Sequence, residues 1–375
     1  KDCEKRYLFG FEGLGRKPMN KLWDLLKEIP GFVRLRADKS VYGHAASRVK
    51  DPKFRMALSF HPLFIGGDPR RVTSMYILVS HLEKAFGVHY VQGGVQALAD
   101  AMGTVVKRLG GSIFLNQRVE EILVDQGKAS GVKLSDGQTI KSDIVVSNAD
   151  PGWTYKNLIK KSSKSRWTDK RLSQSKWSMG LFVWYFGTKG TKNSWKDVGH
   201  HTIINGPRYR GLLKDIFDKK FLAEDMSIYL HRPSCTDKTV APDGADTFYA
   251  LSPVPNLKTS NPVNWDEMGK IYKEKLRKVL NDIIPGFSET IETELILNPQ
   301  DFLSRYLSPY GAGFSLEPRI FQSAWFRPHN VSEEVKNLFL VGAGTHPGAG
   351  IPSVVTSAEV MAKLIPDASN VRIKL

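Results

Sequence analysis

The spacing of apolar residues predicts that the first 85 residues are mostly helical. One amphipathic helix begins near Pro18 and is expected to end at Pro30, and its apolar stripe is Met19, Leu22, Trp23, Leu25, Leu26 and Ile29. A second helical pattern covers residues 71–86. The first helix is interpreted either as packed on the protein or as lying on a membrane surface, with Trp23 as an anchor between lysines.

From Gly87 onward the pattern becomes that of an α/β domain. Gly93-Gly94 opens a predicted helix over residues 95–109. Short β-rich runs then follow, with Asp125-Gln126-Gly127 and Asp136-Gly137 as turn signals, at residues 112–115, 119–124, 132–134 and 139–140. The continuous apolar run 144–146 predicts a buried parallel strand.

Residues 156–320 are dominated by strand patterns, which predicts a mixed or antiparallel second domain. Its candidate strands are 181–186, 227–230 and 248–251, and one helix is predicted over 268–281. The chain then returns to α/β character, with a strand at 338–341, a glycine-rich turn at 342–350 and a helix at 353–365.

Composition indicates a folded protein of about two or three domains. The chain has 375 residues, of which 41% are hydrophobic. Cys3 and Cys235 are too few for a disulfide scaffold or a thiolate metal site, so a reducing compartment is expected and no metal site is predicted. The longest strongly apolar run, residues 179–187, is nine residues, against about 20 needed to cross a bilayer.

The positive charge is concentrated in two stretches. The formal net charge is +16, and the excess of Lys and Arg over Asp and Glu lies in residues 1–90 and 156–220. Such an excess either attracts a polyanion, meaning nucleic acid or an anionic lipid surface, or is a solvated lysine-rich face. No zinc-finger, helix-turn-helix or RNA-recognition signature accompanies it, so nucleic acid is not expected as a partner.

The stretch at residues 337–358 carries the clearest chemical signal. It reads NLFLVGAGTHPGAGIPSVVTSA, a buried strand followed by a glycine-rich turn and the start of a helix. Backbone N–H groups at such a turn allow close approach of a phosphate or another electron-rich group. A nucleating dinucleotide unit needs about 30 residues, so this turn is predicted to complete a nucleotide-binding domain begun earlier in the chain.

The segment VGAGTHPGAGIP at 341–352 resembles the C-terminal flavin motif of bacterial phytoene desaturases, within the amine-oxidase-like flavoproteins. Further segments resemble that family in its order, so the similarity covers essentially the whole chain: SFHPLFIGGDP at 59–69, Gly93-Gly94, SNAD at 147–150, GPRYR at 206–210, SPVP at 252–255 and SAWFRPHN at 323–330.

The resemblance implies a fold of the α/β class. It is an incomplete Rossmann-like FAD-binding domain with an inserted mixed-sheet substrate domain and a helical membrane-facing region. The corresponding divisions are residues 1–86 (helical substrate region), 87–155 (part of the FAD domain), 156–320 (substrate domain) and 321–375 (return to the FAD domain). The family's N-terminal GxGxxG fingerprint has no counterpart in residues 1–90, so this chain is expected to be a fragment that binds FAD weakly or not at all.

The resemblance also implies an activity, the FAD-dependent desaturation of 15-cis-phytoene, a C40 hydrocarbon, towards lycopene. In that family hydride passes to the flavin N5, a neighbouring carbon loses a proton, and a quinone or oxygen reoxidises the flavin. The enzyme is peripheral (monotopic) on the cytoplasmic side of an anionic membrane. Three other readings remain: a neurosporene-forming or later-step carotenoid desaturase, a carotenoid isomerase, and a non-catalytic membrane-associated remnant.

The same resemblance places the cofactor contacts and the pair Asp24 and Lys27, and further candidates come from the residue types. The predicted cofactor contacts are Val119, Gly342, Ala343, Gly344, Thr345, Gly350, Ile351 and Pro352. Acid–base candidates are Asp24, Lys27, His61 and His346, although Asp24 and Lys27 are three residues apart and also suit a plain salt bridge on one helix. The predicted lining of an apolar substrate tunnel is Phe60, Phe64, Phe314 and Trp325.

Overall fold

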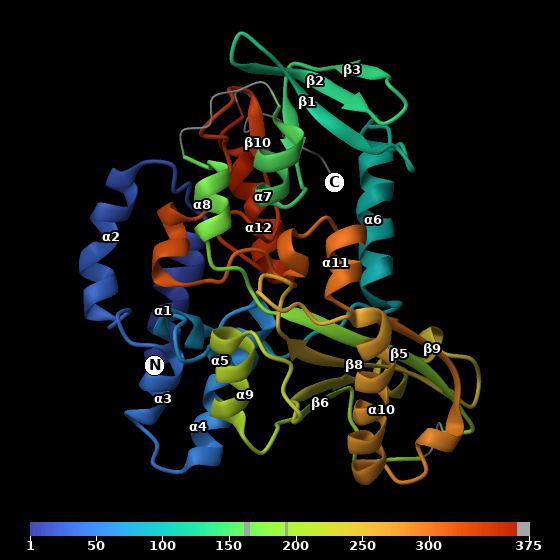
Figure 1. Ribbon diagram of the computed structural model, residues 1–375. Coiled ribbons are helices and arrows are strands. Elements are labelled where there is room, and N and C mark those ends of the chain that lie inside the picture. The colour runs from blue at the N-terminus through green and yellow to red at the C-terminus, as the bar shows by residue number, and fades with distance from the viewer. Residues whose placement is uncertain (161–165, 192–193, 366–375) are drawn as a thin grey trace. The chain divides into compact units, whose positions relative to one another are not determined.

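The computed structural model describes residues 1–160, 166–191 and 194–365 (Figure 1). The chain divides into two compact units: unit 1 comprises residues 1–87, 117–179 and 305–375, and unit 2 comprises residues 88–116 and 180–304. Lys161 and Lys164 of the basic stretch, and residues 366–375, lie outside the described residues. The assignment of functions to residues 1–86, 87–155, 156–320 and 321–375 stays a prediction.

Unit 1 is mainly helical and carries two small sheets. Its helices are α1 (Asp2–Arg6), η1 (Tyr7–Gly15), α2 (Leu22–Arg34), α3 (Val41–Ala46), α4 (Pro52–Ser59), η2 (His61–Ile65), η3 (Ser74–Leu78), α5 (Val79–Phe86), α7 (Pro151–Trp153), η4 (Thr154–Leu158), α8 (Asp169–Gln174), η9 (Pro309–Gly311), η10 (Ile320–Gln322), η11 (Ala324–Phe326) and α12 (Ile351–Ala362). Its strands are β1 (Val119–Asp125), β2 (Lys128–Leu134), β3 (Thr139–Lys141), β4 (Val145–Ser147) and β10 (Leu338–Leu340).

The strands of unit 1 form where the turn residues predict them. β1, β2 and β3 make an antiparallel meander, with Gln126-Gly127 and Asp136-Gly137 in its two turns. β4 pairs in parallel with β10, but it differs from the prediction because only one of its faces is covered. Val145 is buried while Val146 is 44% exposed, so this strand is not buried on both sides.

Helix α2 also differs from the prediction, because it continues through Pro30 to Arg34. Proline removes one backbone hydrogen bond, and on an exposed helix water can take up the freed carbonyl. None of the residues of α2 is buried. Its exposed apolar side chains are Leu22 (48%), Trp23 (63%), Leu26 (40%), Ile29 (44%) and Val33 (65%).

Unit 2 is built on a five-stranded antiparallel sheet with the order β6-β7-β8-β5-β9. Its strands are β5 (Gly180–Lys189), β6 (His201–Ile204), β7 (Ile228–His231), β8 (Ala245–Val254) and β9 (Ile291–Leu297), and its helices are α6 (Gly94–Arg108), α9 (Tyr209–Lys214), η5 (Asp215–Lys219), η6 (Pro233–Cys235), η7 (Lys238–Val240), α10 (Trp265–Ile283), η8 (Ser288–Thr290) and α11 (Pro299–Arg305). The prediction missed β6 and β9. It was wrong about residues 112–115, which form no strand and expose Phe114 and Leu115.

The core of unit 2 lies between this sheet and α10. Tyr272, Leu276 and Leu280 recur along one face of α10 and are almost completely buried against Phe182 and Trp184 of β5. Each large side chain buried in this way contributes about 1.5–3 kcal/mol through the hydrophobic effect. Within the described residues, no helix is both long enough and apolar enough to cross a membrane.

Candidate functional site

The glycine-rich turn lies where the sequence predicts it, between β10 and α12 in unit 1. β10 pairs in parallel with β4, and the Val341 N–H donates to the carbonyl of Ser147 at 3.1 Å. The turn therefore leaves the carboxyl end of two parallel strands, which is where open α/β sheets bind ligands. Gly350 is the N-cap of α12 and offers no side chain to its first N–H groups, so the positive end of the helix dipole faces the turn.

Two glycines allow the loop after β4 to pack directly on this turn. Gly342 has φ +104°, and a Cβ atom there would lie 2.6 Å from the Asn148 side-chain oxygen. A Cβ atom at Gly344 would lie 2.3 Å from the ring of Pro151. Both distances are far below van der Waals contact, so any larger residue would push the loop and the turn apart.

Arg327 holds the turn from inside the protein. Its side chain is 2% exposed, and it donates through Nε to the Thr345 carbonyl (3.0 Å), through Nη2 to the Ala343 carbonyl (2.7 Å) and through Nη1 to the Leu316 carbonyl (3.2 Å). Burial lowers the pKa of Arg327 from its usual value. Backbone oxygens thus solvate a buried cation and fix two carbonyls of the turn.

Asn330 and Ser357 complete this support. The fully buried Asn330 amide donates to the His346 carbonyl at 2.9 Å, and the Ser357 hydroxyl accepts from the Gly342 N–H at 2.9 Å. The prediction did not assign Arg327 or Asn330 to the site. Both lie in the SAWFRPHN segment at 323–330, which was the available signal.

His346 lies in the turn as a buried, neutral imidazole. Its Nε2 lies 3.1 Å from the Leu14 carbonyl and donates to it, while Nδ1 is buried without a hydrogen-bond partner. Burial lowers the pKa of His346 to about 4. The ring can therefore accept a hydrogen bond at Nδ1, but it is a weak base.

Helix η2 brings other predicted residues to the same turn. A Cβ atom on Gly350 would lie 3.9 Å from the Ile65 side chain, so the end of η2 lies beside the end of the turn. His61 and Phe64 belong to η2, and Phe60 precedes it; the Phe60 and His61 rings stack with centroids 4.3 Å apart.

His61 differs from His346 in its partner. Its Nε2 lies 3.1 Å from the Glu83 carboxylate, and its Nδ1 is buried without a hydrogen-bond partner. A carboxylate that accepts from Nε2–H fixes the tautomer that leaves the Nδ1 lone pair available. Glu83 was not predicted, because it lies 22 residues further along the chain.

The four predicted tunnel residues divide into two groups. Phe60 and Phe64 contact each other edge to face at 5.5 Å, and a Cβ atom on Gly66 would lie 2.6 Å from Phe314, which places all three near the end of η2. Trp325 instead stacks under the guanidinium of Arg166, 4.2 Å from the ring centroid. The structure therefore gives Trp325 a cationic neighbour, Arg166, as well as an apolar one, Phe326, whose ring centroid lies 5.3 Å away.

The remaining predicted residues make local contacts. Asp24 accepts from the Lys21 N–H at 3.1 Å at the start of α2, and this hydrogen bond takes the place of the salt bridge suggested with the exposed Lys27. Val119 begins β1 and pairs with Leu134, about 20 Å along the strand from the β1–β2 turn. Ile351 and Pro352 open α12 and are exposed.

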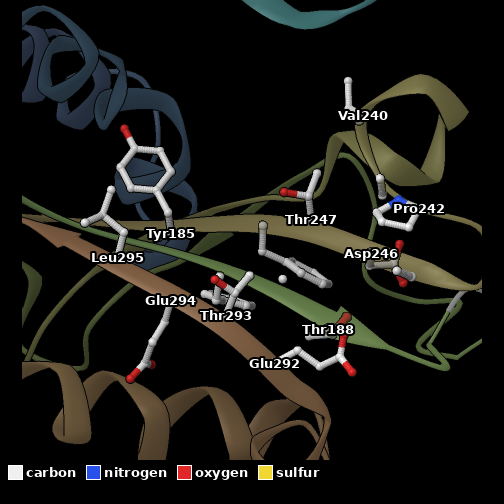
Figure 2. A pocket seen from close by; sticks show the side chains of 15 residues that line it. Tyr185, Thr188, Val240, Pro242, Asp246, Thr247, Glu292, Thr293, Glu294 and Leu295 are labelled. Atoms are coloured by element: carbon white, nitrogen blue, oxygen red, sulfur yellow. The ribbon is translucent and has the colours of Figure 1, made fainter.

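A surface hollow of about 300 Å³ lies in unit 2 (Figure 2). Two of its lining carboxylates are already paired: Asp246 with Arg232 at 2.7 Å, and Glu294 with Lys273 and the Trp184 indole. Polar side chains of Thr188, Thr247 and Thr293 also line it among the apolar ones. It is lined by Tyr185, Phe186, Gly187, Thr188, Val240, Ala241, Pro242, Ala245, Asp246, Thr247, Phe248, Glu292, Thr293, Glu294 and Leu295.

The comparisons with known proteins agree on one family. The family model described as flavin containing amine oxidoreductase matches residues 32–365. A neurosporene-forming phytoene desaturase of Cereibacter sphaeroides is 63% identical over 99% of this chain and 72% of that protein. The neurosporene-forming enzyme of Rhodobacter capsulatus is 62% identical over 98% of this chain and 70% of that protein. A lycopene-forming phytoene desaturase of a Paracoccus species is 42% identical over 97% of this chain and 72% of that protein.

Solved structures agree on the fold. An oxidoreductase from Methanosarcina mazei superposes with a TM-score of 0.59 at 18% identity, over 92% of this chain and 73% of that one. Putrescine oxidase bound to putrescine superposes with a TM-score of 0.57 at 13% identity, over 98% of this chain and 72% of that one. The fold is therefore that of the FAD-dependent amine oxidases, with mixed α and β elements.

Arg327→Lys is expected to lower the free energy of unfolding by about 3 kcal/mol, because lysine keeps the charge but cannot reach the three carbonyls at once. Urea unfolding followed by circular dichroism measures the change. Arg36→Lys is the matched control, since Arg36 is an exposed arginine paired with Asp38 and the change should leave the stability nearly unaltered. Equal losses in the two variants would contradict the proposed support of the turn.

His346→Gln is expected to make the protein less sensitive to acid. The folded-state pKa of about 4 lies below the ordinary value of 6.5, so the unfolded chain binds more protons between these pH values and wild-type stability falls as the pH falls through this window. The wild type should lose about 3 kcal/mol more than the variant between pH 6.5 and 4. Urea unfolding at a series of pH values tests this, and parallel pH profiles would refute it.

Proposed function

This chain belongs to the flavin-containing amine oxidoreductases and, within them, to the bacterial phytoene desaturases, and we propose that it dehydrogenates phytoene as far as neurosporene. The observation that carries the proposal is the 63% identity over 99% of the chain to a relative named neurosporene-forming. The relatives named lycopene-forming are 42%, 41% and 39% identical. Lycopene, the end product expected from the sequence, is therefore not favoured.

FAD is the cofactor of this family, and we propose that the turn at 342–350 contacts one part of the FAD molecule. The turn whose carbonyls Arg327 holds and the open N-terminus of α12 make a cradle that an electron-rich ring system can approach, with Asn148 and Pro151 packed against Gly342 and Gly344. We assign Gly342, Ala343, Gly344 and Thr345 to this cradle. Bound FAD supplies the two-electron oxidation.

His61 is the best-placed residue to accept the proton that desaturation releases. Its Nδ1 carries an available lone pair, its Nε2 is oriented by Glu83, and the Phe60 ring stacks on it, with Phe64 packed edge to face against Phe60. His346 has no carboxylate partner, and burial lowers its pKa to about 4, which makes it a weak base. We therefore assign His61 to proton transfer and His346 to the support of the turn, while Phe60, Phe64 and Phe314 form an apolar wall for the hydrocarbon.

We further propose that α2 holds the protein on an anionic membrane surface, from which a C40 hydrocarbon is reached. A helix with an exposed apolar face and nearby lysines lies in the plane of the lipid interface. Five apolar side chains of α2 are at least 40% exposed, and Lys21 and Lys27 are exposed beside them. Peripheral attachment on the cytoplasmic side, where anionic lipids are enriched, also gives access to a membrane quinone as an electron acceptor, in addition to oxygen.

Expression in phytoene-producing bacteria, followed by chromatography of the pigments, tests the activity. The hybrid to be tested consists of the segment of the Cereibacter sphaeroides enzyme with which this chain does not align, followed by this chain. We expect neurosporene as the end product of the hybrid. His61→Gln in the same hybrid should lower the rate by roughly 100-fold or more, because a positioned base contributes about that factor.

Three reference cultures are grown in parallel. They express the Cereibacter sphaeroides enzyme, the Paracoccus enzyme or this chain without the added segment. Lycopene from the hybrid would reject the neurosporene assignment. A hybrid that is folded and contains flavin but leaves phytoene unchanged would reject the substrate. Pigment from the unjoined chain would reject the expectation that this chain binds FAD weakly or not at all.

The triple change Trp23→Ser, Leu26→Ser and Val33→Ser is expected to weaken binding to anionic vesicles by roughly tenfold or more, because each side chain contributes apolar area. Vesicle co-sedimentation measures the binding. The control carries Val95→Ser, Met102→Ser and Val106→Ser, which removes equally exposed apolar residues from α6. Equal weakening by the two triple changes would show that α2 has no special role.

A further inference from the structure

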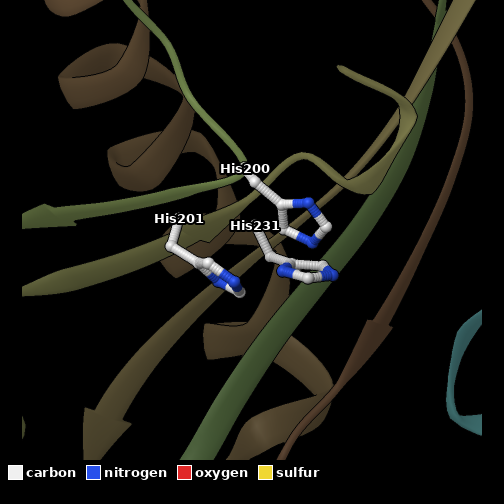
Figure 3. A group of neighbouring side chains, drawn as sticks. All are labelled: His200, His201 and His231. Atoms are coloured by element: carbon white, nitrogen blue, oxygen red, sulfur yellow. The ribbon is translucent and has the colours of Figure 1, made fainter. Parts of the chain in front are cut away.

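Three histidines of unit 2 lie together at one edge of its sheet, and none of them has been assigned a role above. His201 of β6 and His231 of β7 are directly opposite each other in the antiparallel register, and His200 immediately precedes β6. One nitrogen from each ring lies within 4.8 Å of those of the other two. Figure 3 shows the three rings turned toward one another.

Hydrogen bonds fix the tautomer of His200. Its Nδ1 lies 2.6 Å from the Thr236 hydroxyl oxygen, and that hydroxyl donates to the Pro233 carbonyl at 3.3 Å. When the hydroxyl proton lies on that carbonyl, the hydroxyl accepts from Nδ1–H of His200, and Nε2 keeps its lone pair. This Nε2 atom is buried and has no hydrogen-bond partner.

The Tyr229 hydroxyl orients the other two rings. It lies 2.6 Å from Nδ1 of His201 and 3.3 Å from Nδ1 of His231. A phenol has one proton, so at least one of these rings must donate Nδ1–H to it and present a free Nε2 lone pair. Metal-binding histidines are oriented in this way, by a partner on the other ring nitrogen.

The surrounding chain is held firmly. Arg232 follows His231, and its N–H donates to the His200 carbonyl at 2.9 Å. Its buried guanidinium pairs with Asp246 at 2.7 Å and donates to the Val198 carbonyl at 3.3 Å. The loop that carries His200 is thereby tied to β7 and β8.

Ring packing alone does not account for this cluster. Phenyl rings would pack equally well. They would also avoid a buried nitrogen without a hydrogen-bond partner, and such a nitrogen costs about 1–3 kcal/mol of stability.

We propose that His200, His201 and His231 bind one divalent transition-metal cation of the Zn²⁺, Cu²⁺ or Ni²⁺ class. Imidazole nitrogens suit these ions, and three protein ligands leave a fourth position for water or an anion. Tetrahedral metal–nitrogen bonds of about 2.0–2.1 Å place the three ligand nitrogens roughly 3.3 Å apart. The nitrogens now lie within 4.8 Å of one another, so small rotations of the rings bring them to that distance.

Titration of the untagged chain, first dialysed against a chelator, tests the site. Zn²⁺ binding is measured by calorimetry, and the ligand-field absorption of Co²⁺ reports the coordination geometry. We expect one ion per chain, a tetrahedral Co²⁺ spectrum and affinity weakened by roughly tenfold or more in His231→Gln. Thr236→Val, which removes the partner of His200, should weaken binding by roughly tenfold to 100-fold.

His89→Gln is the control, as an exposed histidine of the same unit outside the cluster. It should bind as the wild type does, and metal-free variants should unfold at the wild-type temperature. Zn²⁺ should raise that temperature for the wild type but not for His231→Gln. Absence of stoichiometric binding, or equal affinity in His231→Gln and His89→Gln, would overturn the proposal.

Discussion

The buried guanidinium of Arg327 is the interaction on which the rest of the candidate site depends. A cation removed from water must be surrounded by oxygen atoms, and here backbone carbonyls from two separate segments provide them. Those segments can adopt no other spacing without leaving the charge unsolvated. The close approach at Gly342 and Gly344, the burial of His346 and the start of α12 at Gly350 all follow from the position of a turn fixed in this way.

Local signals made much of unit 1 predictable, whereas tertiary contacts decided the rest. The β1–β2–β3 meander follows from Gln126-Gly127 and Asp136-Gly137, since these turns specify their strands without outside help. The residues of β6 show little strand pattern of their own, and β6 forms because it pairs with β7. The continuation of α2 through Pro30 depends on its exposure to solvent, which a residue pattern does not reveal.

The candidate site shows the same division. The turn at 342–350 could be read from the sequence because strand, glycines and helix are contiguous. The roles of Arg327 and Asn330 could not, because the SAWFRPHN segment that contains them does not reveal which of its residues are buried. The approach of η2 to Gly350 brings together residues almost 300 positions apart in the sequence. The pairing of β6 with β7 brings together His201 and His231, which the sequence analysis did not select as candidates.

The central position of β5 has a consequence for how this chain is made in the cell. β5 is bordered by β8 and β9, which end at Val254 and Leu297, so both of its edges lack their partners when it leaves the ribosome. At the usual speed of translation, β9 follows roughly 5–20 s later. During that interval a nascent strand containing Leu181, Phe182, Val183 and Trp184 is open to mispairing with other chains. Yield in a foreign host should therefore depend on chaperone supply and growth temperature more than on the strength of the finished core.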